Sequence, residues 1–139
     1  MYVDKQCLLS DSQDLSQVAG DYYSTYAYNL GSTTGDPGSG RPLYVVICVD
    51  VAFTSAGSAT VTFAVIDEAD ATLDSGSVVI VQTAAIAIAS LTAGKTIVIP
   101  VPAGLVTQQY LGLKYTIATA TTTAGTVVAF VALDAQLNP

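Results

Sequence analysis

The amino-acid sequence predicts an all-β protein, an antiparallel β-sandwich of the jelly-roll type with about eight strands. Three observations favour this fold class. Apolar residues alternate with other residues over several short segments, which is the repeat of a β-strand. Gly, Pro, Ser and Thr cluster between those segments at near-regular spacing, as they do in turns. The chain shows no long segment with the repeat of an amphipathic helix.

The longest predicted strand covers residues 43–53 and is expected at the centre of a sheet. Its even positions are mixed and include Tyr44, Cys48 and Asp50. Because side chains alternate between the two faces of a strand, the odd positions should form one continuous apolar face. The β-branched residues among them pack well on a pleated surface. These odd positions are Leu43, Val45, Ile47, Val49, Val51 and Phe53.

The other strands are predicted from the same alternation. Residues 59–66 should form a hairpin with the long strand. Asp36-Pro37-Gly38 indicates a turn, because Pro presets φ and Gly accepts a positive φ. Pro100 has no N–H to donate, so the end of its strand should lie at a sheet edge or leave the sheet. Further strands are expected at 26–30, 78–81, 96–101, 110–118 and 126–133, and 84–91 can be a strand or a helical turn.

The first 21 residues stand apart from this pattern, so we divide the chain into residues 1–21 and a single jelly-roll domain, residues 22–139. The Ser-Asp-Ser-Gln segment at 10–13 can cap a short helix starting near Asp14, because side-chain oxygens accept from free backbone N–H groups. The same region can equally be an extended N-terminal arm that becomes ordered against a partner. The sequence leaves both interpretations open.

The composition restricts the classes of partner. The chain is 51% hydrophobic and 11% charged, whereas proteins average about 25% charged residues. The net charge is −7, and the basic residues Lys5, Arg41, Lys95 and Lys114 are scattered singly. Nucleic acids and anionic membranes are bound by clustered Lys and Arg, so neither partner is expected.

Cellular location and thiol state follow from a few segments. The N-terminus lacks the basic and apolar regions of a signal peptide. The most apolar run, residues 78–91, is interrupted by polar residues and is shorter than the roughly 20 residues of a membrane-spanning helix. We therefore expect the protein to be made in the cytoplasm and to leave it only within a larger particle. Cys7 and Cys48 are expected to be reduced, buried thiols.

The sequence offers no group of residues suited to catalysis. It contains no histidine, which removes the commonest general base and metal ligand. Gly94-Lys95-Thr96 resembles the end of a phosphate-binding loop, but Ala89 occupies the position of its first glycine. The acidic segment 67–76 has alanines where a calcium loop needs ligands. We therefore expect no enzyme activity, no bound metal and no cofactor.

Tyrosine is concentrated in one segment. Four of the eight tyrosines lie within residues 22–28. Tyrosine supplies a large, rigid contact area with a polar tip, which suits interfaces and sugar-binding platforms. It also suits half-buried strand positions, but the density of the segment favours an interface. The expected interface residues are Tyr2, Val3, Leu8, Leu9, Tyr22, Tyr23, Tyr26 and Tyr28.

Several fragments spread along the chain resemble a known family. Their motifs are structural rather than catalytic, and together they cover nearly the whole chain. They are Met1-Tyr2-Val3-Asp4, Pro42-Leu43-Tyr44, Leu91-Thr92-Ala93-Gly94, Pro100-Val101-Pro102, Tyr110-Leu111-Gly112-Leu113-Lys114-Tyr115-Thr116, Thr123-Ala124-Gly125 and Leu133-Asp134-Ala135-Gln136. The chain resembles the Bbp16-like cement, or decoration, proteins of tailed-bacteriophage capsids.

This resemblance implies a jelly-roll virion protein that pairs as a homodimer. Such a protein would bind the outer surface of an icosahedral shell built from HK97-type major capsid protein, and it would reinforce the contacts between subunits. Many identical weak contacts on a symmetric lattice reach high avidity, so no single contact needs to be strong. The alternative hypothesis is a carbohydrate-binding or adhesive β-sandwich module of a head fibre or tail, with exposed tyrosines as its platform.

Overall fold

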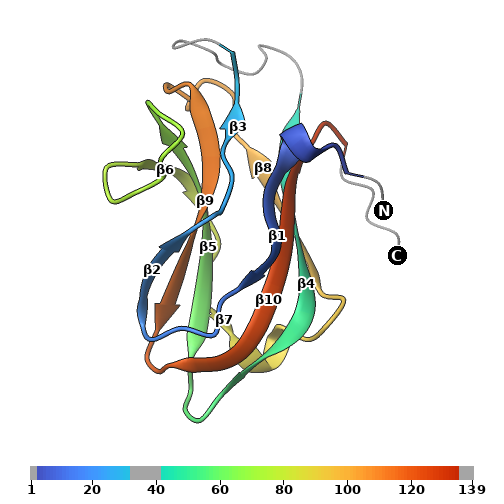
Figure 1. The fold of residues 1–139 in the computed structure, drawn as a ribbon, viewed down its shortest axis with the longest axis vertical. Coiled ribbons are helices and arrows are strands. Elements are labelled where there is room, and N and C mark those ends of the chain that lie inside the picture. Colours follow the sequence, from blue (N-terminus) through green and yellow to red (C-terminus); the bar gives the residue numbers. More distant parts are fainter. Residues whose placement is uncertain (1–2, 32–41, 135–139) are drawn as a thin grey trace.

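Two antiparallel β-sheets packed face to face make up the computed structural model, which describes residues 3–31 and 42–134 (Figure 1). Sheet A is four-stranded, in the order β1, β10, β4, β8. Its central strands β10 and β4 are also its longest, which matches the central position expected for residues 43–53. The bounds are β1 (Leu8–Asp14), β4 (Leu43–Ser55), β8 (Thr96–Val101) and β10 (Thr122–Ala132).

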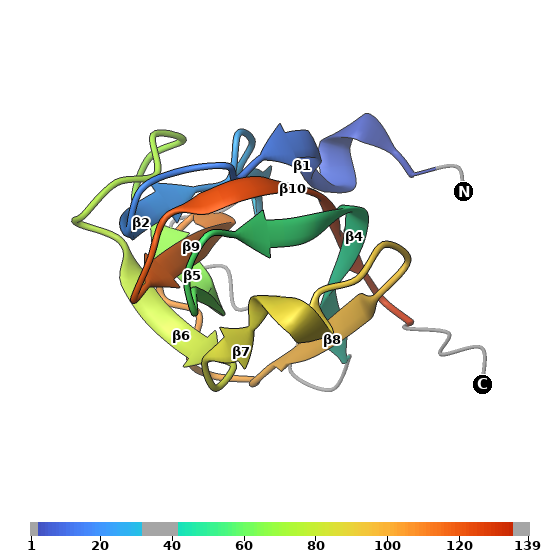
Figure 2. The same ribbon diagram turned by 90° about the horizontal axis from the view of Figure 1, so that it is seen from below.

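Sheet B has the order β2, β9, β5, β6, with β3 also paired to β9 and β7 also paired to β5. Figure 2 shows the two sheets as opposite layers of the sandwich. Short 3₁₀ helices, η1 (Lys5–Cys7) and η2 (Ile88–Ser90), precede β1 and follow β7. The strands of sheet B are β2 (Gly20–Tyr23), β3 (Tyr28–Asn29), β5 (Thr60–Glu68), β6 (Val78–Gln82), β7 (Ile86–Ala87) and β9 (Tyr110–Ala118).

The strand order is that of a jelly roll. β2 and β3 pair with the same neighbour and count as one interrupted strand, and so do β6 and β7. Numbered along the chain on that basis, the strands follow 1-8-3-6 in sheet A and 2-7-4-5 in sheet B. This arrangement is a double-sheet jelly roll. The predicted fold class is therefore confirmed.

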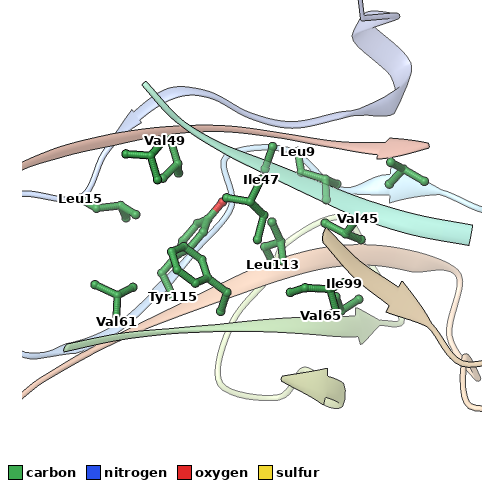
Figure 3. Packing of buried hydrophobic residues seen from close by; sticks show 14 of the residues in the cluster. Leu9, Leu15, Val45, Ile47, Val49, Val61, Val65, Ile99, Leu113 and Tyr115 are labelled. Atoms are coloured by element: carbon green, nitrogen blue, oxygen red, sulfur yellow. The ribbon is translucent and has the colours of Figure 1, made fainter. Parts of the chain in front are cut away.

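The core lies between the sheets and is built from the inward positions of the central strands (Figure 3). The Phe63 and Tyr115 rings pack edge to face, with centroids 5.8 Å apart and planes at 88°. In Figure 3 the Tyr115 side chain lies between the two sheets. Its neighbours in the core include Leu9, Val45, Ile47, Val49, Val61, Val65, Leu111, Leu113, Val127 and Ala129.

The long strand β4 departs from the expected alternation at one residue. Val49 pairs with Val127 while Val51 pairs with Thr126, so β4 holds one extra residue, Asp50, against β10. A bulge of this kind reverses the faces that follow it. Val51 is therefore 48% exposed, and the predicted continuous apolar face is wrong at this position.

A second irregularity in the pairing of β4 with β10 returns the Phe53 side chain to the core. Between Val51 and Thr54 the pairing with β10 shifts again, and Phe53 is buried. The Phe53 ring lies against Gly125, where a Cβ atom would come within 2.5 Å of the ring. Gly125 also has φ +142, so both the space and the backbone at this position require glycine.

The N-terminal segment does not form a unit that ends at residue 21, as the sequence predicted. Residues 8–14 are the edge strand β1, and β2 already begins at Gly20. The expected helix near Asp14 is absent from the described residues, and the 3₁₀ turn η1 lies earlier, with Asp4 accepting from the Gln6 N–H at 3.0 Å. Neither a capped helix nor a free arm describes 8–14, because this segment pairs with β10 as an antiparallel strand.

Some expectations fall where nothing is described, among them the Asp36-Pro37-Gly38 turn and Tyr2 of the expected interface. Within 3–31 and 42–134, no helix has the length and apolar character needed to cross a membrane.

Candidate interaction surface

The structure distributes the tyrosine-rich segment over different sides of the sandwich. Tyr22 pairs with Tyr115 and packs against the core, with its hydroxyl donating to the Val18 carbonyl at 2.9 Å. Tyr28 is also half-buried against the core. Tyr23 pairs with Lys114, so it points outward from sheet B.

Tyr26 and Tyr23 are the tyrosines of this segment that do not pack against the core. Tyr26 is 41% exposed. Burial, followed by the negative charges of Asp21 and Asp74, raises the pKa of the Tyr23 hydroxyl. The structure therefore does not bring the four tyrosines of residues 22–28 into one platform.

The expected N-terminal contact residues are also separated. Val3 is half-buried ahead of η1, and Leu8 is half-buried opposite Phe130. Leu9 follows it at a bulge in β1 and is fully buried in the core. Its place among the expected interface residues is therefore corrected, because the folded protein leaves no Leu9 surface for a partner.

Leu8 belongs to a larger surface, which we call the apolar face: a group of outward-pointing side chains of sheet A that excludes the exposed acids Asp11, Asp14 and Asp50 of the same sheet. Inward and outward residues alternate, so the neighbours of core residues such as Val45 and Ile47 point away from the core. The register aligns them in rows across the strands. Its members are Leu8, Tyr44, Val46, Cys48, Thr96, Val98, Pro100, Val128, Phe130 and Ala132.

None of the residues of the apolar face carries a charge. Val46 and Phe130 pair directly across the strands. Neighbouring side chains cover them, so that only 6% of the Val46 surface and 9% of the Phe130 surface is exposed. Their cross-strand neighbours Leu8 and Val98 remain half-buried. The outer face of an antiparallel sheet is ordinarily polar, and a contiguous apolar patch on it is typical of an interaction site.

Sequence reasoning missed this face, although a signal was present. Strands with one solvated face alternate cleanly, whereas strands covered on both faces have near-continuous apolar runs. The segments 43–49, 96–101 and 127–133 are of the second kind. The tyrosine density drew the prediction to a segment whose side chains serve the core and sheet B instead.

The outward side of sheet B has a different character, because polar groups lie there beside apolar residues such as Ile66 and Val79. Thr116 donates to Asp21 at 2.6 Å, and the Lys114 ammonium lies 3.7 Å from the same carboxylate. Ser77 donates to Glu68 at 2.8 Å. These groups satisfy one another, so this face needs no partner to complete its hydrogen bonds.

The segments examined for catalytic or metal chemistry have structural contacts. Asp67 is buried, and its Oδ2 accepts from the backbone N–H groups of Thr107 and Gln108 at 2.7 and 3.0 Å, which fixes the loop between β8 and β9. Gly94 has φ +82 and donates to the Val49 carbonyl at 2.8 Å, so the Gly94-Lys95-Thr96 segment is a turn leading into β8. Within the described ranges, no three His, Cys, Asp or Glu residues are grouped to hold a metal ion.

The two cysteines are unpaired and half-buried. Burial, with a contribution from the nearby Asp4 carboxylate, raises the pKa of the Cys7 thiol. Cys48 lies on the apolar face, its Sγ 3.9 Å from the Thr96 Oγ1. Both therefore sit in the structure as thiols, as expected, but they are half-buried and not buried as predicted.

The strand order and the two contrasting faces define a small jelly-roll protein with one apolar and one polar outer surface. The chain belongs to the Bbp16 family: the family model, described as Bbp16, matches residues 9–131. The matched span runs from the core residue Leu9 to Val131 and so includes both sheets. Among curated proteins, none matches the chain.

Proposed function

We propose that this protein is a structural virion protein, a cement or decoration protein of a tailed-phage head. In this role it binds the outer surface of a shell of HK97-type major capsid protein and stabilises contacts between neighbouring subunits. Membership of the Bbp16 family supports the proposal. The observation that carries it is the uncharged, apolar face of sheet A, which is suited to burial against another protein surface.

The binding mechanism follows from the chemistry of the apolar face. Removing apolar surface from water contributes about 25 cal/mol per Å² and needs no charged partner. A jelly roll is a rigid platform, so little conformational freedom is lost when it binds. A copy that spans two capsid subunits holds them together, and repetition over a symmetric shell multiplies the effect.

The proposal includes several further expectations. The protein acts without catalysis, cofactor, nucleic acid or membrane, and it pairs as a homodimer. It is made in the host cytoplasm and resides on the outer capsid surface. The absence of histidine from the sequence supports a binding rather than a catalytic role. Because the apolar face lacks charge, binding should persist at high ionic strength, where contacts between exposed charges are screened.

The test is co-sedimentation of purified protein with shells that lack it. We expect saturable binding to assembled shells at low and at high salt, and none to unassembled subunits. Val128→Lys, which places a charge in the centre of the apolar face, should abolish this binding. Thr62→Lys is the matched control, because Thr62 is also half-buried, outward and on a central strand, but in sheet B.

Equal binding by the two variants would contradict the role given to the apolar face. Binding only to unassembled subunits would contradict the cement function itself. Both variants should first show cooperative thermal unfolding, so that a loss of binding reports the surface and not the fold.

The alternative function, a carbohydrate-binding or adhesive module, finds less support. Such a module needs exposed aromatic side chains grouped on one surface. Tyr22 and Tyr28 pack against the core instead, and Tyr23 points outward from sheet B. A glycan array should give no signal above background, and specific binding of a sugar would favour this alternative.

A further inference from the structure

The strand β6 is an edge of sheet B with unusual composition. Its five residues are Val-Val-Ile-Val-Gln, without charge and without proline. Within the described part of the chain, β6 pairs on one side with β5. Val78 and Val79 are 52% and 39% exposed. A strand edge with unpaired N–H and C=O groups and apolar side chains is a template for pairing with another chain.

The other sheet edges have features that oppose such pairing. β1 has register shifts at two places against β10, the exposed acids Asp11 and Asp14, and Ser12 at φ 45. β8 contains the exposed Pro100, which has no N–H to offer. β2 is four residues long and β3 only two.

β6 carries one such feature, a bulge. Val79 and Val81 pair with the consecutive residues Ile66 and Val65, so Ile80 is the extra residue. Ile80 packs against the core, and the bulge leaves Val78 and Val79 exposed. Among the described edge strands longer than two residues, β6 is thus the one that is apolar, uncharged and free of proline.

We propose that β6 is the pairing edge of a homodimer, on which β6 of a second copy adds as an antiparallel neighbour. The two sheets B then form one continuous sheet about a two-fold axis. This inference specifies the interface of the homodimer that is part of the proposed function. It rests on the proposed function only in taking from it that two copies of the chain pair.

Charge favours a second copy in this orientation. Each chain carries a net charge of −7, so two copies repel each other. This repulsion is weakest where the surfaces in contact are neutral. β6 itself is neutral, but the loop before it carries Asp70 and Asp74. A parallel arrangement would place two such loops side by side. The antiparallel arrangement places each loop beside the uncharged segment 83–85 of the other copy.

The same geometry relates the dimer to the apolar face. A two-fold axis perpendicular to a sheet keeps the same side of that sheet uppermost in both copies. Sheet A lies on one side of sheet B in each copy (Figure 2). Both apolar faces therefore point the same way, and one shell surface can be contacted by both, which doubles the apolar area buried for each dimer.

The experiment is sedimentation equilibrium of the full chain over a range of concentrations. We expect wild-type protein to reach the mass of two chains. Val79→Glu should weaken dimerisation by at least about tenfold, because it places a carboxylate within the neutral pairing surface. Thr62→Glu adds the same charge to the outer face of sheet B, one strand in from this edge, and should leave the dimer intact.

Hydrogen exchange of the wild-type protein supplies a second measurement that does not depend on how a variant folds. The β6 amides should exchange more slowly as the dimer forms. Wild-type protein with the mass of one chain at every concentration would overturn the inference. So would a dimer whose β6 amides exchange as fast as in the monomer, or a Val79→Glu variant that still dimerises.

Failure of the cement function is distinguishable from these results. It would appear as absence of wild-type binding to shells, whatever the mass in solution. A monomeric Val79→Glu variant that still binds shells, but about tenfold or more weakly, is the result expected if both proposals hold.

Discussion

The two outer faces of the sandwich differ although the same fold builds them. On sheet B the outward side includes polar groups that bind one another, as Thr116, Lys114 and Asp21 do. On sheet A the outward rows are apolar from β1 across to β8, and the pair Val46 and Phe130 is almost completely buried by its neighbours. The polar groups on the outer face of sheet B thus satisfy one another in water, whereas sheet A presents a second apolar layer outside the core.

This difference indicates where a binding function resides in a chain with few charges. A jelly roll needs apolar residues only on the inner faces of its sheets. The paired segments 43–49 of β4 and 127–132 of β10 are apolar on both faces, which folding alone does not require. The extra apolar residues are therefore the part of the sequence that points to a partner.

The largest expected effect tests whether the two sides of sheet A are correctly assigned. Val49→Asp places an unpaired charge in the core, where Val49 is 1% exposed. The cost is several kcal/mol, about the stability of a small domain, so the variant should not fold. Val51→Asp, two residues along the same strand, should cost about 1 kcal/mol or less because Val51 is outside.

Circular dichroism and thermal melting of the two variants measure this contrast. A cooperatively melting Val49→Asp variant would mean that the inner and outer faces of β4 have been exchanged. Unfolding of both variants would mean that the bulge at Asp50 does not turn Val51 outward.

The second prediction compares adjacent leucines of β1 that serve opposite sides of sheet A. Leu9→Ala should destabilise the fold by about 2–5 kcal/mol, because it leaves a cavity in the core. Leu8→Ala should cost less, but it should weaken shell binding because Leu8 belongs to the apolar face. Urea denaturation and co-sedimentation check the two effects. A Leu9→Ala variant of unchanged stability would restore the interpretation of this segment as a free arm.

The third prediction concerns the layer between the faces, where Ser10 links Tyr115 to Gln13. The Ser10 hydroxyl donates to Gln13 Oε1 at 2.6 Å, so the Tyr115 hydroxyl, 2.8 Å away, donates to Ser10. Burial of this hydroxyl between the two sheets raises the pKa of Tyr115. The pKa of Tyr115 in the folded protein exceeds the value of about 10 in the unfolded chain. The stability that the neutral Tyr115 hydroxyl contributes is therefore complete below pH 10 and is lost as the pH rises above 10.

Stability should therefore fall by about 1.4 kcal/mol per pH unit above pH 10 through this group alone. Tyr115→Phe should cost about 1 kcal/mol at neutral pH, and it should remove this part of the alkaline slope. Urea midpoints between pH 8 and about 11 measure the difference. Parallel pH profiles for the two proteins would contradict the burial of an ionisable Tyr115 hydroxyl.

The smallest effect is expected on the polar face. Asp21→Ala removes a partner of both Thr116 and Lys114, but the pair is largely exposed, so the cost should be about 1 kcal/mol or less. Shell binding should be unchanged. A variant that folds normally but no longer binds shells would show that sheet B, and not sheet A, faces the capsid.

Much of the fold was accessible from the sequence because alternation is a local signal. The strand predicted at residues 110–118 coincides with β9, and those at 43–53, 59–66 and 96–101 coincide with β4, β5 and β8 to within a few residues. The segment 84–91, left open between a strand and a helical turn, forms both β7 and η2. The order of the strands within the sheets follows from the jelly-roll class.

What the sequence did not predict depends on contacts between distant segments. β1 looked irregular because two register shifts interrupt its alternation, and it is held as a strand by pairing with β10 more than a hundred residues later. The exposure of Val51 arises from its register with β10, which no local pattern reports. The apolar face likewise exists only once β1, β4, β8 and β10 lie side by side.

The most direct test of the central claim is a cryo-EM map of shells decorated with this protein. The account predicts that the apolar face of sheet A, with Val128 and Val98 in its rows, is buried against the major capsid protein while sheet B faces solvent. A map in which the outer face of sheet B contacts the shell, or in which the apolar face is open to solvent, would contradict it.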